Sequence, residues 1–263
     1  MDRYSTITIS VKGTSATISL NRPEAHNAMD IGMIRELSKA FRQLSDNPDI
    51  RVIVLNSNGR NFSSGADLQW MQEGLGQDRD QLEAESRELA TLFRIIADSG
   101  PVVVASVRGK AIGGAVGLVA ASDLAIAERD TVFRFSEVKL GLIPATIAPF
   151  VLRKAGTAAT AGWFLTGREF TAVAALEAGL IQYVCPEDQL EKETGSLVKE
   201  LISGGPAALR GIKKLLRKYS VAGDPDEILA ETAALIAAYR TSAEGQEGIK
   251  AFFEKRKPRW THE

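Results

Sequence analysis

The chain is organised around the stretch Pro101-Val-Val-Val-Ala-Ser-Val-Arg-Gly-Lys-Ala-Ile-Gly-Gly-Ala-Val-Gly-Leu-Val-Ala-Ala-Ser-Asp123. Its first part, residues 102–107, is short, apolar and rich in β-branched side chains, as in a strand that is covered on both faces. Residues 115–121 carry small apolar side chains, which let a helix pack close to its neighbours. Gly113 and Gly114 stand at the junction, where the backbone can approach a ligand and unpaired helix N–H groups point at it. Such a junction is suited to a negatively charged oxygen.

This glycine turn has two interpretations. One is the dinucleotide-binding fingerprint G-x-G-x-x-G, which the glycines at 109, 113, 114 and 117 do not match. The other is an oxyanion hole, in which two backbone donors hold the oxygen of a reacting carbonyl. The turn Asn61-Phe-Ser-Ser-Gly-Ala-Asp67, which follows an apolar run at residues 52–55, supplies a candidate for the second donor. Either turn alone is typical of a helix cap, but both turns in this order favour the oxyanion hole.

The composition excludes several classes of function. The 263 residues are 44% hydrophobic, which is enough for a sizeable core, and 32 basic against 33 acidic residues leave no excess charge for nucleic acid or an anionic membrane. A single cysteine, Cys185, fits a reducing compartment, and two histidines, His26 and His262, make a histidine-rich metal site improbable. No signal-like start and no apolar run near about 18 residues is present. We therefore expect a soluble, cytoplasmic protein that binds no metal.

The hydrophobic pattern predicts an α/β part followed by a helical part. Alternating residues around Lys12-Gly13-Thr14 predict a hairpin of strands 7–11 and 16–20, and Asp30 is placed to cap a helix that ends near Asn47. Further strands are predicted at 52–55, 102–107, 124–127 and the start of 132–144, and further helices at 78–98, 115–121, 147–153, 158–165, 172–178, 189–202, 206–219, 226–239 and 243–255. We place the division near Ala155, which gives an α/β core at 1–155 and a helical region at 156–263.

Several ordered motifs closely resemble the crotonase, or enoyl-CoA hydratase/isomerase, superfamily. They are Asn21-Arg-Pro-Glu-Ala-His-Asn-Ala28, Phe62-Ser-Ser-Gly-Ala-Asp67, Gly109-Lys-Ala-Ile-Gly-Gly114, Ser136-Glu-Val-Lys-Leu-Gly-Leu-Ile-Pro144 and Glu247-Gly-Ile-Lys-Ala-Phe-Phe-Glu-Lys-Arg-Lys257. The resemblance implies an α/β spiral of ββα units with a helical C-terminal region for trimer formation, commonly in a dimer of trimers. It also implies an acyl-CoA thioester as substrate, so that coenzyme A arrives with the substrate and no separate cofactor is needed.

The resemblance assigns the reacting groups. The backbone N–H groups of Ala66 and Gly114 would stabilise the thioester enolate, in agreement with the independent interpretation of the two turns. Typical hydratases of the family carry two glutamates; only the second is here, as Glu137, and Gly117 occupies the position of the first. Without the resemblance, Glu137 would be taken for a solvated loop carboxylate.

The missing glutamate leaves two reactions open. The segments around Gly117 and 136–147 look most like bacterial hydratases of 3-methylglutaconyl-CoA and γ-carboxygeranoyl-CoA, which predicts hydration of a branched or carboxylated enoyl-CoA with Glu137 handling the proton. Gly117 would then remove a charge that repels the substrate's extra carboxylate and leave it room. A single glutamate alternatively resembles the Δ3,Δ2-enoyl-CoA isomerases.

The coenzyme A end is also assigned by resemblance. Backbone near Glu24 and His26 would border the nucleotide and pantetheine channel, and Phe252 and Lys255 of a neighbouring subunit would reach the nucleotide. The full set of substrate-binding positions is Glu24, His26, Ala66, Asp67, Leu68, Gly114, Phe252 and Lys255. Gln69 stands where many relatives have a lysine, so Arg22 or Lys255 is a candidate for the phosphates. Trp70 and Met71 follow the first turn and either line the acyl pocket or, as we favour, serve as helix packing. The segments after residue 158 are expected to wall the pocket.

Two other classes of function compete with these reactions. A non-catalytic CoA-binding scaffold would have lost its chemistry with the first glutamate, but it would have no need of Glu137. A hydrolase would use Ser136 or Ser106 as nucleophile, and it lacks a histidine partner other than His26, so only a serine–lysine pair stays open.

Overall fold

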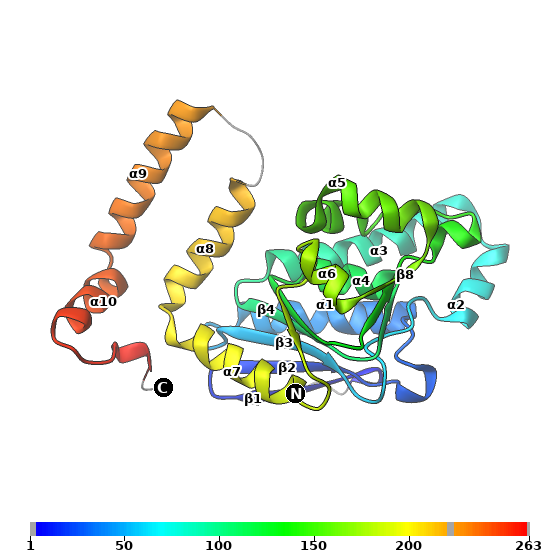
Figure 1. Cartoon of the computed structure of the whole chain (residues 1–263), viewed down its shortest axis with the longest axis horizontal. Helices are drawn as coiled ribbons and strands as arrows, with labels where there is room; N and C mark the ends of the chain where they lie inside the picture. The colour runs from blue at the N-terminus through cyan, green and yellow to red at the C-terminus, as the bar shows by residue number, and fades with distance from the viewer. Residues whose placement is uncertain (1–3, 220–223, 262–263) are drawn as a thin grey trace. The chain divides into compact units, whose positions relative to one another are not determined.

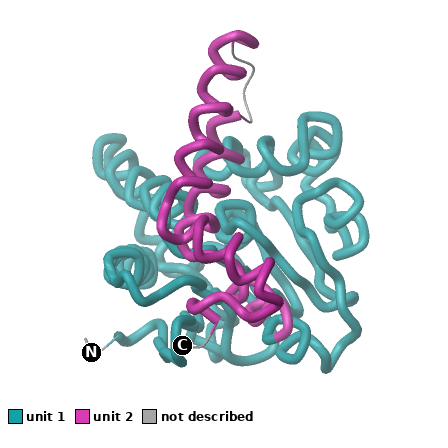
Figure 2. The backbone as a smooth tube through the Cα atoms, turned by 90° about the vertical axis from the view of Figure 1, so that its left-hand side faces the viewer, with its two compact units in different colours: residues 1–195 teal, residues 196–263 magenta. Residues whose placement is uncertain are grey.

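The computed structural model describes residues 4–219 and 224–261, so His262 lies outside the described residues. The chain divides into two compact units, Met1–Gly195 and Ser196–Glu263 (Figure 2). The first unit is α/β and the second is helical. In the described part of the chain, no helix combines the length and the apolar character that crossing a bilayer requires.

The main sheet of the first unit has six strands in the order β1-β2-β3-β4-β6-β9. They are β1 (Ile7–Lys12), β2 (Ser15–Leu20), β3 (Val52–Ser57), β4 (Val102–Val107), β6 (Leu124–Glu128) and β9 (Tyr183–Cys185). β1 and β2 form the predicted antiparallel hairpin, and every later pairing is parallel. β4 is buried along its whole length, as its β-branched run predicts.

A second sheet of three strands carries the chain toward the glycine turns. It consists of β5 (Lys110–Ile112), β7 (Val132–Arg134) and β8 (Glu169–Thr171). Neither β5 nor β8 is predicted from the sequence, and neither is β9, because each has only three residues and shows no periodicity of its own. The aromatic rings of Trp163 and of Phe170, which lies on β8, stack with centroids 3.9 Å apart.

The helices of the first unit are α1 (Ile31–Asp46), α2 (Leu68–Glu73), α3 (Arg79–Asp98), α4 (Gly114–Ala121), α5 (Ala148–Thr166), α6 (Ala172–Glu177) and the start of α7 (Leu190–Ser203), with short 3-10 turns η1 (Pro23–Ala25), η2 (Gly74–Gly76) and η3 (Glu137–Leu140). Helices α1, α3, α4 and α5 lie in layers on one side of the main sheet (Figure 1), whereas the start of α7 lies against the other side, where Ser106 of β4 and Thr194 share a hydrogen bond of 2.9 Å. Asp30 caps α1 as predicted, since its carboxylate accepts from the N–H of Met33 at 2.7 Å. α5 covers both predicted helices of that region, and Gly156 marks the kink between them.

Helix α4 is the centre of the first unit. Residues 115–121 are all buried, and α3 and α5 pack against the helix. Small side chains make this close packing possible. The sequence β4, β5, α4 therefore delivers Gly113 and Gly114 from the sheet into the interior.

The second unit contains α8 (Pro206–Lys218), α9 (Pro225–Thr241), α10 (Ala243–Phe253) and η4 (Arg259–Thr261). Glu244 joins two of its helices, because its carboxylate accepts from the N–H groups of Ala207 and Ala208 at 2.8 and 2.9 Å.

The units divide at residue 195, forty residues after the predicted boundary at 155. The reason is strand pairing: β8 and β9 bind β7 and β6, so the chain up to residue 185 belongs with the α/β unit. The trimer stays a prediction.

Candidate active site

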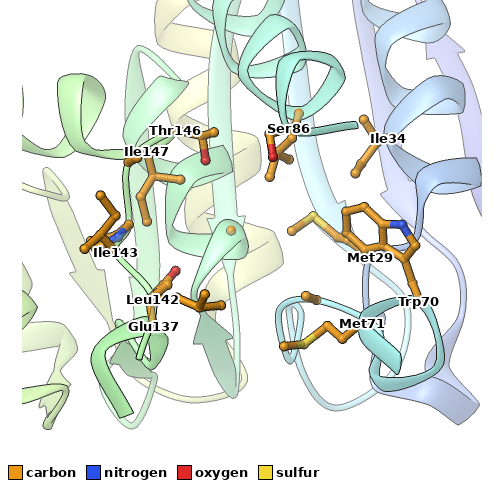
Figure 3. Close-up of a pocket in the computed structure, with 15 residues that line it drawn as sticks. Met29, Ile34, Trp70, Met71, Ser86, Glu137, Leu142, Ile143, Thr146 and Ile147 are labelled. Atoms are coloured by element: carbon orange, nitrogen blue, oxygen red, sulfur yellow. The ribbon is translucent and has the colours of Figure 1, made fainter. Parts of the chain in front are cut away.

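A pocket of about 430 Å³ opens within the first unit. It is lined by Met29, Ile34, Ala66, Trp70, Met71, Ser86, Leu89, Gly114, Glu137, Leu142, Ile143, Pro144, Ala145, Thr146 and Ile147. Figure 3 shows Trp70 on one side of it and Ile143 and Glu137 on the other. Most of these side chains are apolar; Ser86 and Thr146 supply hydroxyl groups, and Glu137 is the one charged side chain among the described lining residues. The pocket suits an apolar molecule with one reacting polar end.

The turn at Ala66 presents a free backbone donor to this pocket. The N–H of Met29 donates to the carbonyl of Gly65 at 2.7 Å, and the N–H of Asp67 donates to the carbonyl of Met29 at 2.9 Å. These two bonds flank Ala66 and leave its own N–H without an acceptor among residues 4–219 and 224–261. Glycine is required at 65, because φ is +93° and a Cβ there would lie 2.8 Å from the carbonyl oxygen of Ile112.

The second turn presents another free donor beside the first. Gly114 begins α4, and its N–H has no acceptor within the described ranges, as expected for the first residue of a helix. Two hydrogen bonds hold the turns side by side: Ser63 N–H donates to Lys110 at 2.9 Å, and Ile112 N–H donates to Ser63 at 3.1 Å. Both predicted oxyanion donors, Ala66 and Gly114, therefore line one pocket.

Glu137 lies at the start of η3, against the second turn. A Cβ built on Gly113 would lie 3.1 Å from its Oε1. Its Oε2 is buried and has no hydrogen-bond partner in the described part of the chain. Burial raises the pKa of this carboxyl above its ordinary value of 4.5, which favours the protonated form. A carboxylate with one oxygen unpartnered in this way is poised to take and return a proton.

The position of Gly117 contradicts part of the sequence-based hypothesis. Gly117 is buried in α4 and does not line the pocket. A Cβ at this position would lie 2.6 Å from the ring of Phe93 and would collide with Ile147. The space above Gly117 is thus filled by apolar side chains, and it offers no room for a substrate carboxylate.

We expect Gly117→Glu to destabilise the protein without creating a two-glutamate site. Overpacking costs about 1–3 kcal/mol, and a buried charge adds to it, so Tm should fall by several degrees in thermal unfolding. Gly162→Glu is the matched control, since Gly162 is also helical but has nothing within 4 Å of its Cβ position. A folded Gly117→Glu variant with unchanged Tm and a gain in hydration would contradict this account of the packing.

Arg22 is engaged within the protein instead of standing ready for a phosphate. Its guanidinium donates to the carbonyl of Ala28 at 2.8 Å and forms ion pairs with Asp30 and Asp67, each at 2.9 Å. Asp67 in turn caps α2. Desolvation raises the pKa of the Asp67 carboxyl, but the bonds from Arg22 and from the first N–H groups of α2 outweigh it and hold the pKa below its usual range.

The predicted coenzyme A residues are not gathered by the first unit alone. Glu24 and His26 are exposed on the loop before α1, where the carbonyl of His26 accepts from the N–H of Ser64 at 3.0 Å. Leu68 is 82% exposed and does not line the pocket. Phe252 and Lys255 belong to the second unit, where Phe252 is 78% exposed.

Trp70 and Met71 line the pocket, so the alternative interpretation is confirmed, and Trp70 also packs against the core as expected of helix packing. The indole N–H of Trp70 donates to the carboxylate of Glu85 on α3 at 2.8 Å. The opposite wall was missed: the lining ends at Ile147, so helices after residue 158 do not wall the pocket. The sequence does contain a signal for this wall, because the large apolar residues beside Gly141 follow neither a helical nor a strand period. In the structure these residues are exposed; Ile143, for example, is 79% exposed.

A family model described as enoyl-CoA hydratase/isomerase matches residues 11–263. A crystal structure of an enoyl-CoA hydratase from Shewanella pealeana superimposes with a TM-score of 0.94 at 37% identity, covering 98% of this chain and 97% of that one. This similarity confirms the predicted α/β crotonase-like fold.

Two curated relatives carry different names. Enoyl-CoA hydratase domain-containing protein 3, mitochondrial, of Danio rerio is 32% identical over 252 residues, which are 95% of this chain and 86% of that protein. A trans-2-decenoyl-(acyl-carrier-protein) isomerase of Streptococcus mutans is 30% identical over 262 residues, or 98% of each chain.

Proposed function

The chain belongs to the enoyl-CoA hydratase/isomerase family, and from this premise we propose that it isomerises an uncharged 3-enoyl-CoA to the 2-enoyl-CoA. The observation that carries the proposal is the single carboxylate among the described lining residues, Glu137, whose Oε2 is buried and has no hydrogen-bond partner and which lies against the Gly113 turn. A water molecule has no second carboxylate to hold it among the described lining residues, because position 117 is glycine and no other acidic side chain lines the pocket.

In the proposed reaction the thioester oxygen accepts hydrogen bonds from the N–H groups of Ala66 and Gly114. The Glu137 carboxylate removes a proton from the α-carbon, and the electron pair of that C–H bond moves into a dienolate whose negative charge rests on the thioester oxygen. Glu137 then returns the proton to the γ-carbon, and the double bond ends between the α- and β-carbons. The proton taken equals the proton given back, so no second acid or base is required.

The lining favours an uncharged acyl group over the carboxylated substrate that the motifs predict. Among the described lining residues none is lysine, arginine or histidine. A substrate carboxylate buried there would face Glu137 without a compensating cation, and two unit charges about 4 Å apart repel by several kcal/mol at an effective dielectric near 20. We therefore assign the pocket to a hydrocarbon chain.

Hydration of a 2-enoyl-CoA is the second candidate, since the hydroxyl groups of Ser86 and Thr146 lie in the same pocket and offer hydrogen bonds to a water. Glu137 would activate that water for attack on the β-carbon and then protonate the α-carbon. A non-catalytic scaffold is disfavoured, because a carboxylate oxygen that is buried without a partner, such as Glu137 Oε2, weakens a fold and is retained where chemistry needs it.

The two reactions are separated by a panel of three substrates: trans-3-hexenoyl-CoA, crotonyl-CoA and 3-methylglutaconyl-CoA. We expect trans-3-hexenoyl-CoA to gain the ultraviolet absorption of a conjugated thioester with no mass change. Water gained by crotonyl-CoA, seen by mass spectrometry, would favour hydration. Water gained by 3-methylglutaconyl-CoA, at a rate above that of both uncharged substrates, would refute the assignment of an uncharged chain.

A further inference from the structure

We propose that Arg22 is a positioning residue for the oxyanion hole, and this inference rests on the proposed function. Arg22 lies in the loop between β2 and α1, while the Ala66 turn comes after β3. The two segments meet in one short parallel bridge, which pairs Met29 with Ala66. The direction of the Ala66 N–H therefore depends on how firmly this bridge is held.

The guanidinium of Arg22 spans the bridge. On one side it donates to the carbonyl of Ala28, the residue before Met29, at 2.8 Å. On the other side it pairs at 2.9 Å with Asp67, the residue after Ala66. One rigid planar group thus connects the chain neighbours of both bridge residues, and a planar fork loses little freedom per hydrogen bond formed.

Further bonds tie the same two loops together. The side-chain amide of Asn27 accepts from the Arg22 N–H at 2.8 Å and donates to the carbonyls of Asn58 and Asn61 at 2.8 and 2.9 Å. Asn27 is fully buried, so these bonds are shielded from water. Arg22 is 22% exposed, but both of its acidic partners are already engaged with it. The Arg22 guanidinium therefore acts on the loops around Ala66 and not on a bound ligand.

The first test separates this role from a contact to the coenzyme A phosphates. We expect Arg22→Ala to lower kcat about ten-fold with little change in KM, as a fraction of the 100- to 1000-fold that a lost oxyanion donor costs. The kcat of Arg22→Lys should lie between those of the wild type and Arg22→Ala, because an ammonium group keeps the charge but lacks the planar fork of the guanidinium. A rise in KM with unchanged kcat would overturn the proposal and make Arg22 a phosphate ligand.

The matched control is Arg35→Ala. Arg35 also forms a two-pronged ion pair, with Glu88 at 2.7 and 2.8 Å, but on the outer surface of α1 and α3. We expect its kcat to equal that of the wild type. Circular dichroism and Tm show whether each variant is folded.

A second readout needs no turnover. Bound 2,4-hexadienoyl-CoA absorbs at longer wavelength when its carbonyl oxygen is polarised by hydrogen bonds. At saturating ligand, Arg22→Ala should show a smaller red shift than the wild type, with Kd changed less than about three-fold. An unchanged red shift in folded Arg22→Ala would overturn the proposal. If the wild type shows a red shift but isomerises nothing, the proposed reaction fails while the positioning role is still measured.

Discussion

Glu137→Gln is expected to lower the turnover of trans-3-hexenoyl-CoA by about 100- to 10,000-fold while leaving the binding of its CoA moiety intact. The amide has nearly the same shape but cannot take a proton, and general acid–base catalysis contributes a factor of that size. No other carboxylate lines the pocket among the described residues, so none can substitute for it. Glu169→Gln, at an exposed position of β8, is the control and should keep full activity.

We expect Glu137→Gln to raise the stability of the folded protein while it lowers the activity. Because burial raises the pKa of Glu137 above 4.5, the folded protein holds this proton more tightly than the unfolded chain does. The wild type therefore loses stability relative to Glu137→Gln as the pH rises from about 4.5 through the raised pKa. At neutral pH the variant should have the higher Tm, which is the usual trade between stability and activity. An inactive variant with a lower Tm would instead point to damaged structure.

The pH dependence of the wild type follows from the same group. The reaction begins with the ionised carboxylate, so kcat/KM should fall as the pH drops through the raised pKa of Glu137. A profile that keeps its full rate well below that value would mean that another group removes the proton.

The fold follows from the sequence wherever a pattern is local. The β-branched run at 102–107 is β4 at the predicted bounds, and the glycine junction opens α4. Strand β5 was missed, because the three residues between Gly109 and Gly113 are too few to show a period, and their pairing with β7 is visible only in three dimensions. The division at residue 195 was missed for the same reason, since β8 and β9 are recruited by distant strands.

In the site, too, the residues marked by local sequence features were predicted, and the contacts made between distant segments were not. Ala66, Gly114 and Glu137 were singled out by turn chemistry and resemblance, and they line one pocket. What surrounds Gly117 could not be predicted, because Phe93 comes from α3 and Ile147 from a loop thirty residues further on. Spacing along a chain says which residue types are present but not which atoms fill a particular space. Arg22 was likewise offered, with Lys255, as a candidate for the phosphates because Gln69 replaces a lysine, and only the positions of Ala28 and Asp67 connect it to the turn.

Gly113→Ala should reduce kcat by about 100- to 1000-fold, the effect of losing one oxyanion donor. Gly113 has φ +53° and ψ −121°, a combination that essentially only glycine adopts. A Cβ there would also lie 3.1 Å from Glu137 Oε1. Relief of either strain rotates the peptide that carries the Gly114 N–H or displaces the carboxylate.

Two variants make this effect specific. Gly13→Ala also places a Cβ at a positive φ, +56° in the β1–β2 hairpin, with nothing within 4 Å of the Cβ position, so it should lose stability but not activity. Gly114→Ala should be milder than Gly113→Ala, because its Cβ meets only the terminal methyl of Met29 at 2.7 Å, and that flexible end can move aside. If Gly114→Ala were the more damaging of the two, bulk at the donor would matter more than the direction of its N–H. If folded Gly113→Ala kept the kcat of the wild type, the second donor would have to be sought outside this turn.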